Sequence, residues 1–168
     1  ILRLLADTAR ITEGSILYRD EDGRTTDITK LEPDGEEIRD IRGDQISMIF
    51  QEPMTAFSPV PTINNQISEM LIYHRGMTKE DAKKETIDLL RRVGIPDPET
   101  RVDDYTFQFS GGMRQRAMIA MGIACSPRVL IADEPTTALD VTIQAQVLKM
   151  IKKMQVELNL SLVLITHD

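Results

Sequence analysis

The stretch that decides the fold is Val129-Leu-Ile-Ala-Asp133-Glu134-Pro135. Its first four residues form a short apolar run, which is typical of a strand covered on both faces. The sequence predicts a helix before it, from Ser110 to about Ala124, and a helix after it, from Thr142 to Asn159. A second apolar run, Ser161–Ile165, predicts another buried strand. Because helix, strand, helix and strand follow one another, we expect a parallel sheet of the α/β class.

The first part of the chain adds strands and a set of helices. Residues Gln45–Phe50 alternate and then run apolar, which predicts a further buried strand. Between about residues 62 and 108 we expect a helical insert without strands, since apolar residues recur at helical spacing through Asn64–Val93. Thr78 followed by Asp81 indicates where the second of its two helices begins. The remaining expectations are a helix tail at Ile1–Leu5, a strand at Gly14–Tyr18, a helix at Glu36–Ile41 and a loop over Pro96–Tyr105.

Composition and charge exclude several classes of protein. The 168 residues are 41% apolar and 28% charged, which argues against a disordered chain or a collagen-like repeat. A net charge of −7 argues against nucleic acid as a partner, because proteins that bind it usually carry a basic excess. The single cysteine, Cys125, cannot form an internal disulfide and fits a reducing compartment. No secretory signal is recognisable, and the most apolar stretch, Ala117–Cys125, is about half as long as a membrane span.

Two adjacent carboxylates, Asp133 and Glu134, follow the apolar run at 129–132. In an open parallel sheet, ligands bind beyond the carboxyl ends of the strands. An Asp in this place can hold Mg²⁺, and a Glu beside it can act as the general base for an attacking water. The alternative is an ordinary polar strand end followed by a proline turn.

The segment Phe109-Ser110-Gly111-Gly112-Met113 opens the helix that precedes this strand. A serine and two glycines leave the backbone N–H groups at a helix start open to approach, and the helix dipole favours an anion there. Arg114 and Arg116 add positive potential. The alternative is a helix that Ser110 merely caps.

Three further polar residues stand at the ends of predicted elements. Gln51 follows the strand that ends at Phe50, and its neutral amide can coordinate Mg²⁺ or water. His167 follows the last strand and could contact a phosphate or hold the attacking water. Asp140 most simply caps the next helix, although it could also reach across a subunit interface. Taken singly, Gln51 and His167 are more typical of ordinary loop and surface residues.

Taken in order, these motifs resemble the ATP-binding-cassette (ABC) transporter ATPase family. Gln51 is similar to its Q-loop, Phe-Ser-Gly-Gly-Met at 109–113 to its signature motif, and Val-Leu-Ile-Ala-Asp-Glu at 129–134 to Walker B. Ala-Leu-Asp at 138–140 resembles the D-loop, and Thr-His-Asp at 166–168 the switch histidine. The longer phrases at 48–55, 108–116 and 132–146 look like the oligopeptide/dipeptide importer subfamily.

The resemblance implies a P-loop NTPase-like parallel core, here incomplete, with an α-helical insert. It implies ATP and Mg²⁺ as ligands, with Asp133 and Gln51 serving the metal, Glu134 the attacking water and His167 the γ-phosphate. Ser110, Gly111 and Gly112 would bind the ATP of a second ATPase subunit, and Asp140 of the D-loop is a further nucleotide-binding residue that the resemblance implies. The implied partners are that subunit, transmembrane permease subunits and, indirectly, an extracytoplasmic solute-binding protein. The implied place is the cytoplasmic face of the membrane, as a peripheral subunit of a peptide importer.

One family motif is absent from the sequence. No Gly-x-x-x-x-Gly-Lys-Ser/Thr loop (Walker A) occurs, and we interpret the chain as a fragment of a longer ATPase. Its expected parts are 1–51, a partial core up to the Q-loop; 52–108, the rest of the Q-loop and the helical subdomain; and 109–168, the remaining core motifs. Two alternatives stay open: an ABC ATPase outside transport, and a catalytically silent piece that donates only its signature motif to a partner.

Overall fold

A computed structural model describes residues 1–4, 9–51, 57–136 and 140–166 of the chain. The chain divides into two compact units, Ile1–Arg42 and Gly43–Asp168. The second unit holds the parallel sheet and most of the helices.

The first unit is a small antiparallel hairpin with a helix. Strands β1 (Leu17–Arg19) and β2 (Thr25–Asp27) pair antiparallel, and a 3-10 helix (Ile28–Lys30) and α1 (Glu36–Ile41) follow. Helix α1 has the predicted bounds, whereas the first strand begins later than the predicted Gly14. Buried Ile28 and Ile38 form part of the apolar interior.

The helix tail predicted at Ile1–Leu5 is wrong for the four residues that the structure describes, 1–4. Arg3 has a left-handed backbone, with φ of 56°. The Leu2 carbonyl accepts a hydrogen bond from Arg42 Nε at 2.8 Å, and the Arg3 guanidinium donates to the Thr29 carbonyl. Long-range side-chain contacts therefore hold this segment, in place of the local backbone bonds of a helix.

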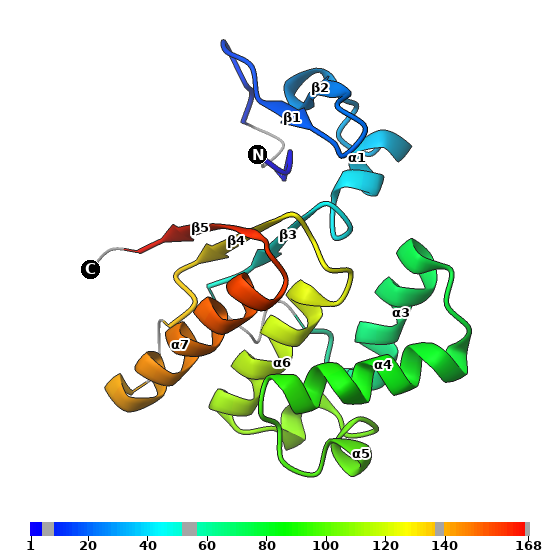
Figure 1. Cartoon of the computed structure of the whole chain (residues 1–168), viewed down its shortest axis with the longest axis vertical. Helices are drawn as coiled ribbons and strands as arrows, with labels where there is room; N and C mark the ends of the chain where they lie inside the picture. Colours follow the sequence, from blue (N-terminus) through cyan, green and yellow to red (C-terminus); the bar gives the residue numbers. More distant parts are fainter. Residues whose placement is uncertain (5–8, 52–56, 137–139, 167–168) are drawn as a thin grey trace. The chain divides into compact units, whose positions relative to one another are not determined.

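The second unit contains the predicted parallel sheet. Its strands are β3 (Ile46–Ile49), β4 (Val129–Asp133) and β5 (Ser161–Ile165), in the order β3-β4-β5 (Figure 1). Both pairings are parallel, and Ile131 of β4 lies opposite Met48 of β3 and Val163 of β5. All three strands therefore present their carboxyl ends at one edge of the sheet.

Two long helices pack on this sheet. These are α6 (Gly111–Ile123) and α7 (Val141–Glu157), which lie together below the strands in the view of Figure 1. Buried residues of both helices, such as Ile119 and Val147, share one apolar cluster with Leu130 and Ala132 of β4. A Cβ built at Gly122 would lie 3.3 Å from Ile49 Cγ1, so α6 approaches β3 closely at this glycine.

The middle of the unit is helical, as the sequence predicts. Helices α3 (Ile63–Arg75) and α4 (Lys79–Arg92) pack against each other and against α6, and no strand occurs over residues 62–108, all of which are described. The predicted cap is confirmed, since Thr78 Oγ1 accepts from the Asp81 N–H at 3.2 Å. The loop expected at Pro96–Tyr105 contains a short helix, α5 (Pro98–Arg101), with proline at its start, where its fixed φ suits a helix.

Strand β5 is more exposed than its apolar sequence predicts. Val163, Leu164 and Ile165 are 41–45% exposed, whereas Leu130 and Ala132 of β4 are fully buried. Among the described residues β3 and β5 both pair only with β4, but β3 is buried because α6 packs closely against it. The prediction of a buried strand is therefore confirmed for β4 and wrong for β5.

Candidate functional site

The Asp133–Glu134 pair lies at the carboxyl end of the central strand β4. Asp133 is the last residue of the strand and Glu134 the first after it, and both are half-buried. Glu134 has a left-handed backbone with φ of 45°, and its N–H donates to the carbonyl of Ile165 on β5 at 3.0 Å. The chain therefore turns sharply here, and the turn is fastened to the neighbouring strand.

Gln51 meets this pair from the other neighbouring strand. It lies two residues beyond the end of β3, and its Nε2 atom donates to Glu134 Oε2 at 2.6 Å. The two residues are far apart in sequence, but parallel pairing of β3 and β4 brings both strand ends to the same edge. The structure thus joins two of the residues that the sequence singles out.

The Ser-Gly-Gly segment forms the start of α6, as predicted. Ser110 is the N-cap, and its Oγ accepts from the Met113 N–H at 3.3 Å. Ser110 and Gly111 are exposed, and no atom lies within 4 Å of a Cβ built at Gly111. Gly112 is half-buried beside Ile143 of α7. The backbone at this helix start is therefore open to a ligand on its Ser110–Gly111 side.

Asp140 caps α7, which was the simplest prediction for it. Its Oδ1 atom accepts from the N–H groups of Thr142 at 3.1 Å and Ile143 at 3.0 Å. His167 and the two residues before Asp140 in the predicted D-loop, Ala138 and Leu139, lie outside the described residues. The structure therefore gives no position for the predicted switch histidine.

The donor set at the end of β4 fits Mg²⁺ bound together with a phosphate ligand. Mg²⁺ commonly takes one or two carboxylates, substrate phosphates and water, and it does not require an all-protein cage. Asp133 supplies a carboxylate. Gln51 supplies the Oε1 atom of an amide whose nitrogen is hydrogen-bonded to Glu134. Within the described ranges, no group of three or more His, Cys, Asp or Glu side chains could hold a metal alone.

Sequence reasoning missed Gln115, which contacts the turn after Glu134. This side chain is 1% exposed, and its Nε2 atom donates to the Pro135 carbonyl at 2.5 Å. The signal was present, because Gln115 precedes Met118, Ile119 and Gly122 at the spacing of one helix face. A polar residue on a buried face needs a hydrogen-bond partner.

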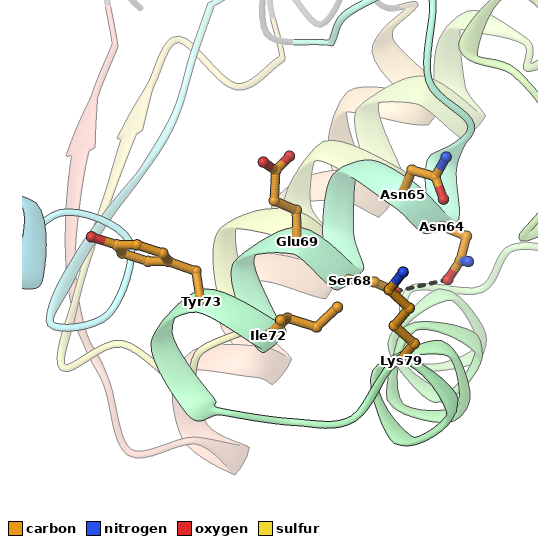
Figure 2. A pocket seen from close by; sticks show the side chains of 7 residues that line it. All are labelled: Asn64, Asn65, Ser68, Glu69, Ile72, Tyr73 and Lys79. Atoms are coloured by element: carbon orange, nitrogen blue, oxygen red, sulfur yellow. Dashed lines mark hydrogen bonds between the residues drawn. The ribbon is translucent and has the colours of Figure 1, made fainter.

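A second feature that the sequence did not reveal is a hollow over α3, shown in Figure 2. Its volume is about 510 Å³. Ile72 and Tyr73, which are 37% and 64% exposed, project from α3, and Lys79 stands at the start of α4. The lining residues are Asn64, Asn65, Ser68, Glu69, Ile72, Tyr73 and Lys79.

The fold and the motifs at its sheet edge define a P-loop NTPase-like core. Within that class, the sequence model of the ABC transporter family matches residues 1–137, and the chain belongs to this family. None of the helices in the described ranges is long and apolar enough to span a membrane.

Named relatives place the chain near peptide transport proteins. It is 51% identical over 161 residues to the dipeptide transport ATP-binding protein DppD of Bacillus subtilis, covering 96% of this chain and 46% of that protein. It is 48% identical over 165 residues to the oligopeptide transport ATP-binding protein AmiE of Streptococcus pneumoniae, covering 98% and 45%. The chain thus spans about half the length of the curated relatives it matches.

A solved structure shares the fold. It is a dimeric post-hydrolysis state of the ATP-binding cassette MJ0796 bound to ADP and Pi. The TM-score is 0.78 at 28% sequence identity, and the match covers 99% of this chain and 68% of that chain.

Proposed function

We propose that this chain is part of the ATP-hydrolysing motor subunit of an ABC importer for peptides or similar small solutes. The observation that carries the proposal is the 2.6 Å hydrogen bond between Gln51 and Glu134 at the carboxyl end of a parallel sheet. It joins the amide of Gln51 to a candidate general base, Glu134, beside a candidate metal ligand, Asp133. The names of relatives about 50% identical over nearly the whole chain support peptides as the transported class.

Each site residue has a role in this proposal. Asp133 and Gln51 would hold Mg²⁺, which would neutralise phosphate charge. Glu134 orients the attacking water and takes its proton. As the water oxygen bonds to the γ-phosphorus, the bond from that phosphorus to the ADP oxygen breaks. His167 contacts the γ-phosphate, and Gln51 holds the Glu134 carboxylate in place through its amide N–H.

The open start of α6 serves a second subunit. Ser110, Gly111 and Gly112 bind the γ-phosphate of the partner's ATP through backbone N–H groups and the helix dipole. Exposure of Ser110 and Gly111 supports this role, since a site used by a partner must face outward. Asp140, at the start of α7, lies near that interface and has a capping role in its own helix.

The remaining partners follow from transport. Transmembrane permease subunits would receive the motion of the helical segment 52–108, and the exposed Ile72 and Tyr73 of the hollow suit an apolar contact. A solute-binding protein outside the cell acts indirectly, and a net charge of −7 gives no support to a nucleic-acid partner. The chain would then work at the cytoplasmic face of the membrane as a peripheral subunit.

The decisive experiment replaces Glu134 with Gln in the complete protein. Glu134→Gln removes the base and keeps the shape, so we expect ATP binding to persist and turnover to fall by about a hundredfold or more. Glu80→Gln, the same change at an exposed position of α4, is the matched control and should leave turnover unchanged. Near-normal hydrolysis by Glu134→Gln would overturn the role of Glu134 as the general base, on which the proposal rests.

A further inference from the structure

Gln115 occupies a buried position on the helix that begins with Ser110. Its neighbours on α6 include Ala117, Met118 and Ile119, all buried and apolar. Gln115 itself is 1% exposed, and its Nε2 donates to the Pro135 carbonyl at 2.5 Å. The acceptor is the Pro135 carbonyl oxygen, so the Gln115 amide must point its nitrogen toward that oxygen. A buried amide that loses its partner is costly, and this bond therefore fixes the distance between helix and turn.

The turn that Gln115 holds is the one that carries Glu134. Pro135 is the next residue, and the Glu134 N–H is bonded to the Ile165 carbonyl at 3.0 Å. Glu134 also has a left-handed backbone, with φ of 45°. A residue other than glycine keeps this conformation where its surroundings impose it. The turn is thus fastened on one side by β5 and on the other by α6.

The Glu134 side chain is fastened separately, by Gln51 at 2.6 Å. A shift of the Pro135 carbonyl would change the backbone from which this side chain projects, and so would move the carboxylate away from Gln51. Catalytic groups lose efficiency steeply with displacements of about 1 Å. The position of the Glu134 carboxylate therefore depends on Gln115 as well as on Gln51.

Gln115 also shares a helix with the Ser-Gly-Gly start. It lies in the second turn of α6, just after the exposed Ser110 and Gly111. A helix moves as a rigid element over so short a distance, so a displacement of its N-terminus is carried to the Gln115 amide. A ligand that binds at Ser110–Gly111 would in this way act on the turn after β4.

We propose that Gln115 is a positioning residue that couples the open start of α6 to the Glu134 carboxylate of the same chain, through the Pro135 carbonyl. The inference rests on the proposed function, because it assumes that Glu134 acts on the attacking water. Gln115 is buried, and in this proposal it acts through the Pro135 carbonyl. Its effect is to set where Glu134 stands when the start of α6 is occupied.

The test uses two Gln115 variants and one control variant of the complete protein with its partners, in steady-state ATP hydrolysis. Gln115→Met keeps the length of the side chain and removes the donor, and we expect kcat to fall on the order of tenfold while KM for ATP changes little. Gln155→Met makes the same change on α7, away from the turn, and should keep the wild-type kcat. A Gln115→Met protein that folds and keeps kcat within about twofold of wild type would overturn the proposal.

The second variant separates positioning from simple stability. Gln115→Glu cannot donate when ionised but donates when protonated, and burial against a carbonyl raises the pKa of such a carboxyl. Its kcat relative to wild type should rise as the pH falls from about 8 to about 6. A merely structural role would make stability depend on pH but would leave kcat of the folded protein unchanged, so a constant kcat ratio would overturn the proposal even if Gln115→Met fails to fold.

Failure of the proposed function has a different signature. If Glu134→Gln keeps wild-type turnover, Glu134 is not the base, whatever the Gln115 variants show. If Glu134→Gln abolishes turnover and the Gln115 variants behave as wild type, only the coupling is wrong.

Discussion

Glu134 is held in a backbone conformation that glutamate disfavours. Its φ of 45° lies in the left-handed region, which costs most residues with a Cβ about 1 kcal/mol. The conformation lets the chain leave β4 sharply while the Glu134 N–H bonds to Ile165. Such strain persists where surroundings over-determine the backbone, and here it occurs at the candidate base.

Replacement of Glu134 by Gly should therefore separate stability from activity. Glu134→Gly relieves the left-handed backbone, and we expect the free energy of unfolding to stay equal or to rise by up to about 1 kcal/mol. Turnover of ATP should fall as far as in Glu134→Gln. Denaturant unfolding and steady-state hydrolysis of the complete protein measure the two effects.

Asn159→Gly is the control for that experiment. Asn159 has a similar backbone, with φ of 51°, and it follows α7 away from the carboxylate pair. The control should gain stability without losing turnover. A large loss of stability in Glu134→Gly alone would show that the Gln51 contact, and not the backbone, dominates at this position.

The contact between Gln51 and Glu134 could be anticipated from the sequence, because both residues follow strands of a parallel sheet. The role of Gln115 could not, since its partner is a backbone carbonyl that depends on how α6 packs beside the turn. His167 remains a prediction from the sequence. At the residue scale, strand ends are predictable and buried side-chain partners are not.

Secondary-structure elements were predictable where a local signal marks their start. Ser110 and Thr78 cap α6 and α4 as the sequence indicates, because an N-cap depends on residues only three positions away. The prediction fails at Ile1–Leu4, where Arg42 and Arg3 make long-range hydrogen bonds, and for the burial of β5, which depends on the elements that pack against the strand. Burial is a property of the assembled sheet, and apolar sequence alone does not determine it.

The start of α4 should make stability depend on acid pH. The Thr78 hydroxyl, which donates to Asp81 at 2.9 Å, and then Lys84 lower the pKa of Asp81 below the ordinary 3.8. The folded pKa is thus below the unfolded one, so the stabilisation is present above pH 3.8 and is lost as the pH falls through the folded pKa. Asp81→Asn should lower the denaturant midpoint at neutral pH, with a difference that disappears in strong acid.

Asp88→Asn is the comparison for this prediction, because Asp88 lies on the same helix, away from the cap. Its effect should be smaller at neutral pH. An Asp81→Asn protein with the same midpoint as wild type at every pH would show that the cap needs only the Thr78 hydroxyl.

At the scale of the whole molecule, Cys125 reports on the integrity of the second unit. The thiol is 1% exposed, and burial raises its pKa to about 11. Because the thiolate is the reactive form, alkylation by iodoacetamide near pH 8 should be slower than for the unfolded chain by on the order of a hundredfold. Mass spectrometry after timed labelling, with and without denaturant, measures the ratio. Equal rates would mean that this unit opens readily around Cys125.

The 168 residues by themselves should bind ATP poorly, although they contain most of the proposed site. The sequence lacks the Gly-rich loop with Lys that supplies N–H donors and positive charge to the β- and γ-phosphates. At the carboxyl end of β4 the charges that remain include Asp133 and Glu134, which repel a polyphosphate. We expect calorimetric titration with Mg²⁺–ATP to give an affinity at least about a hundredfold below that of the complete protein.

Circular dichroism must first show that the 168-residue polypeptide is folded, because exposed Val163, Leu164 and Ile165 on β5 favour association. Micromolar binding by the folded polypeptide would place the nucleotide elsewhere on the chain, and the roles proposed for Gln51, Asp133 and Glu134 would then fail together.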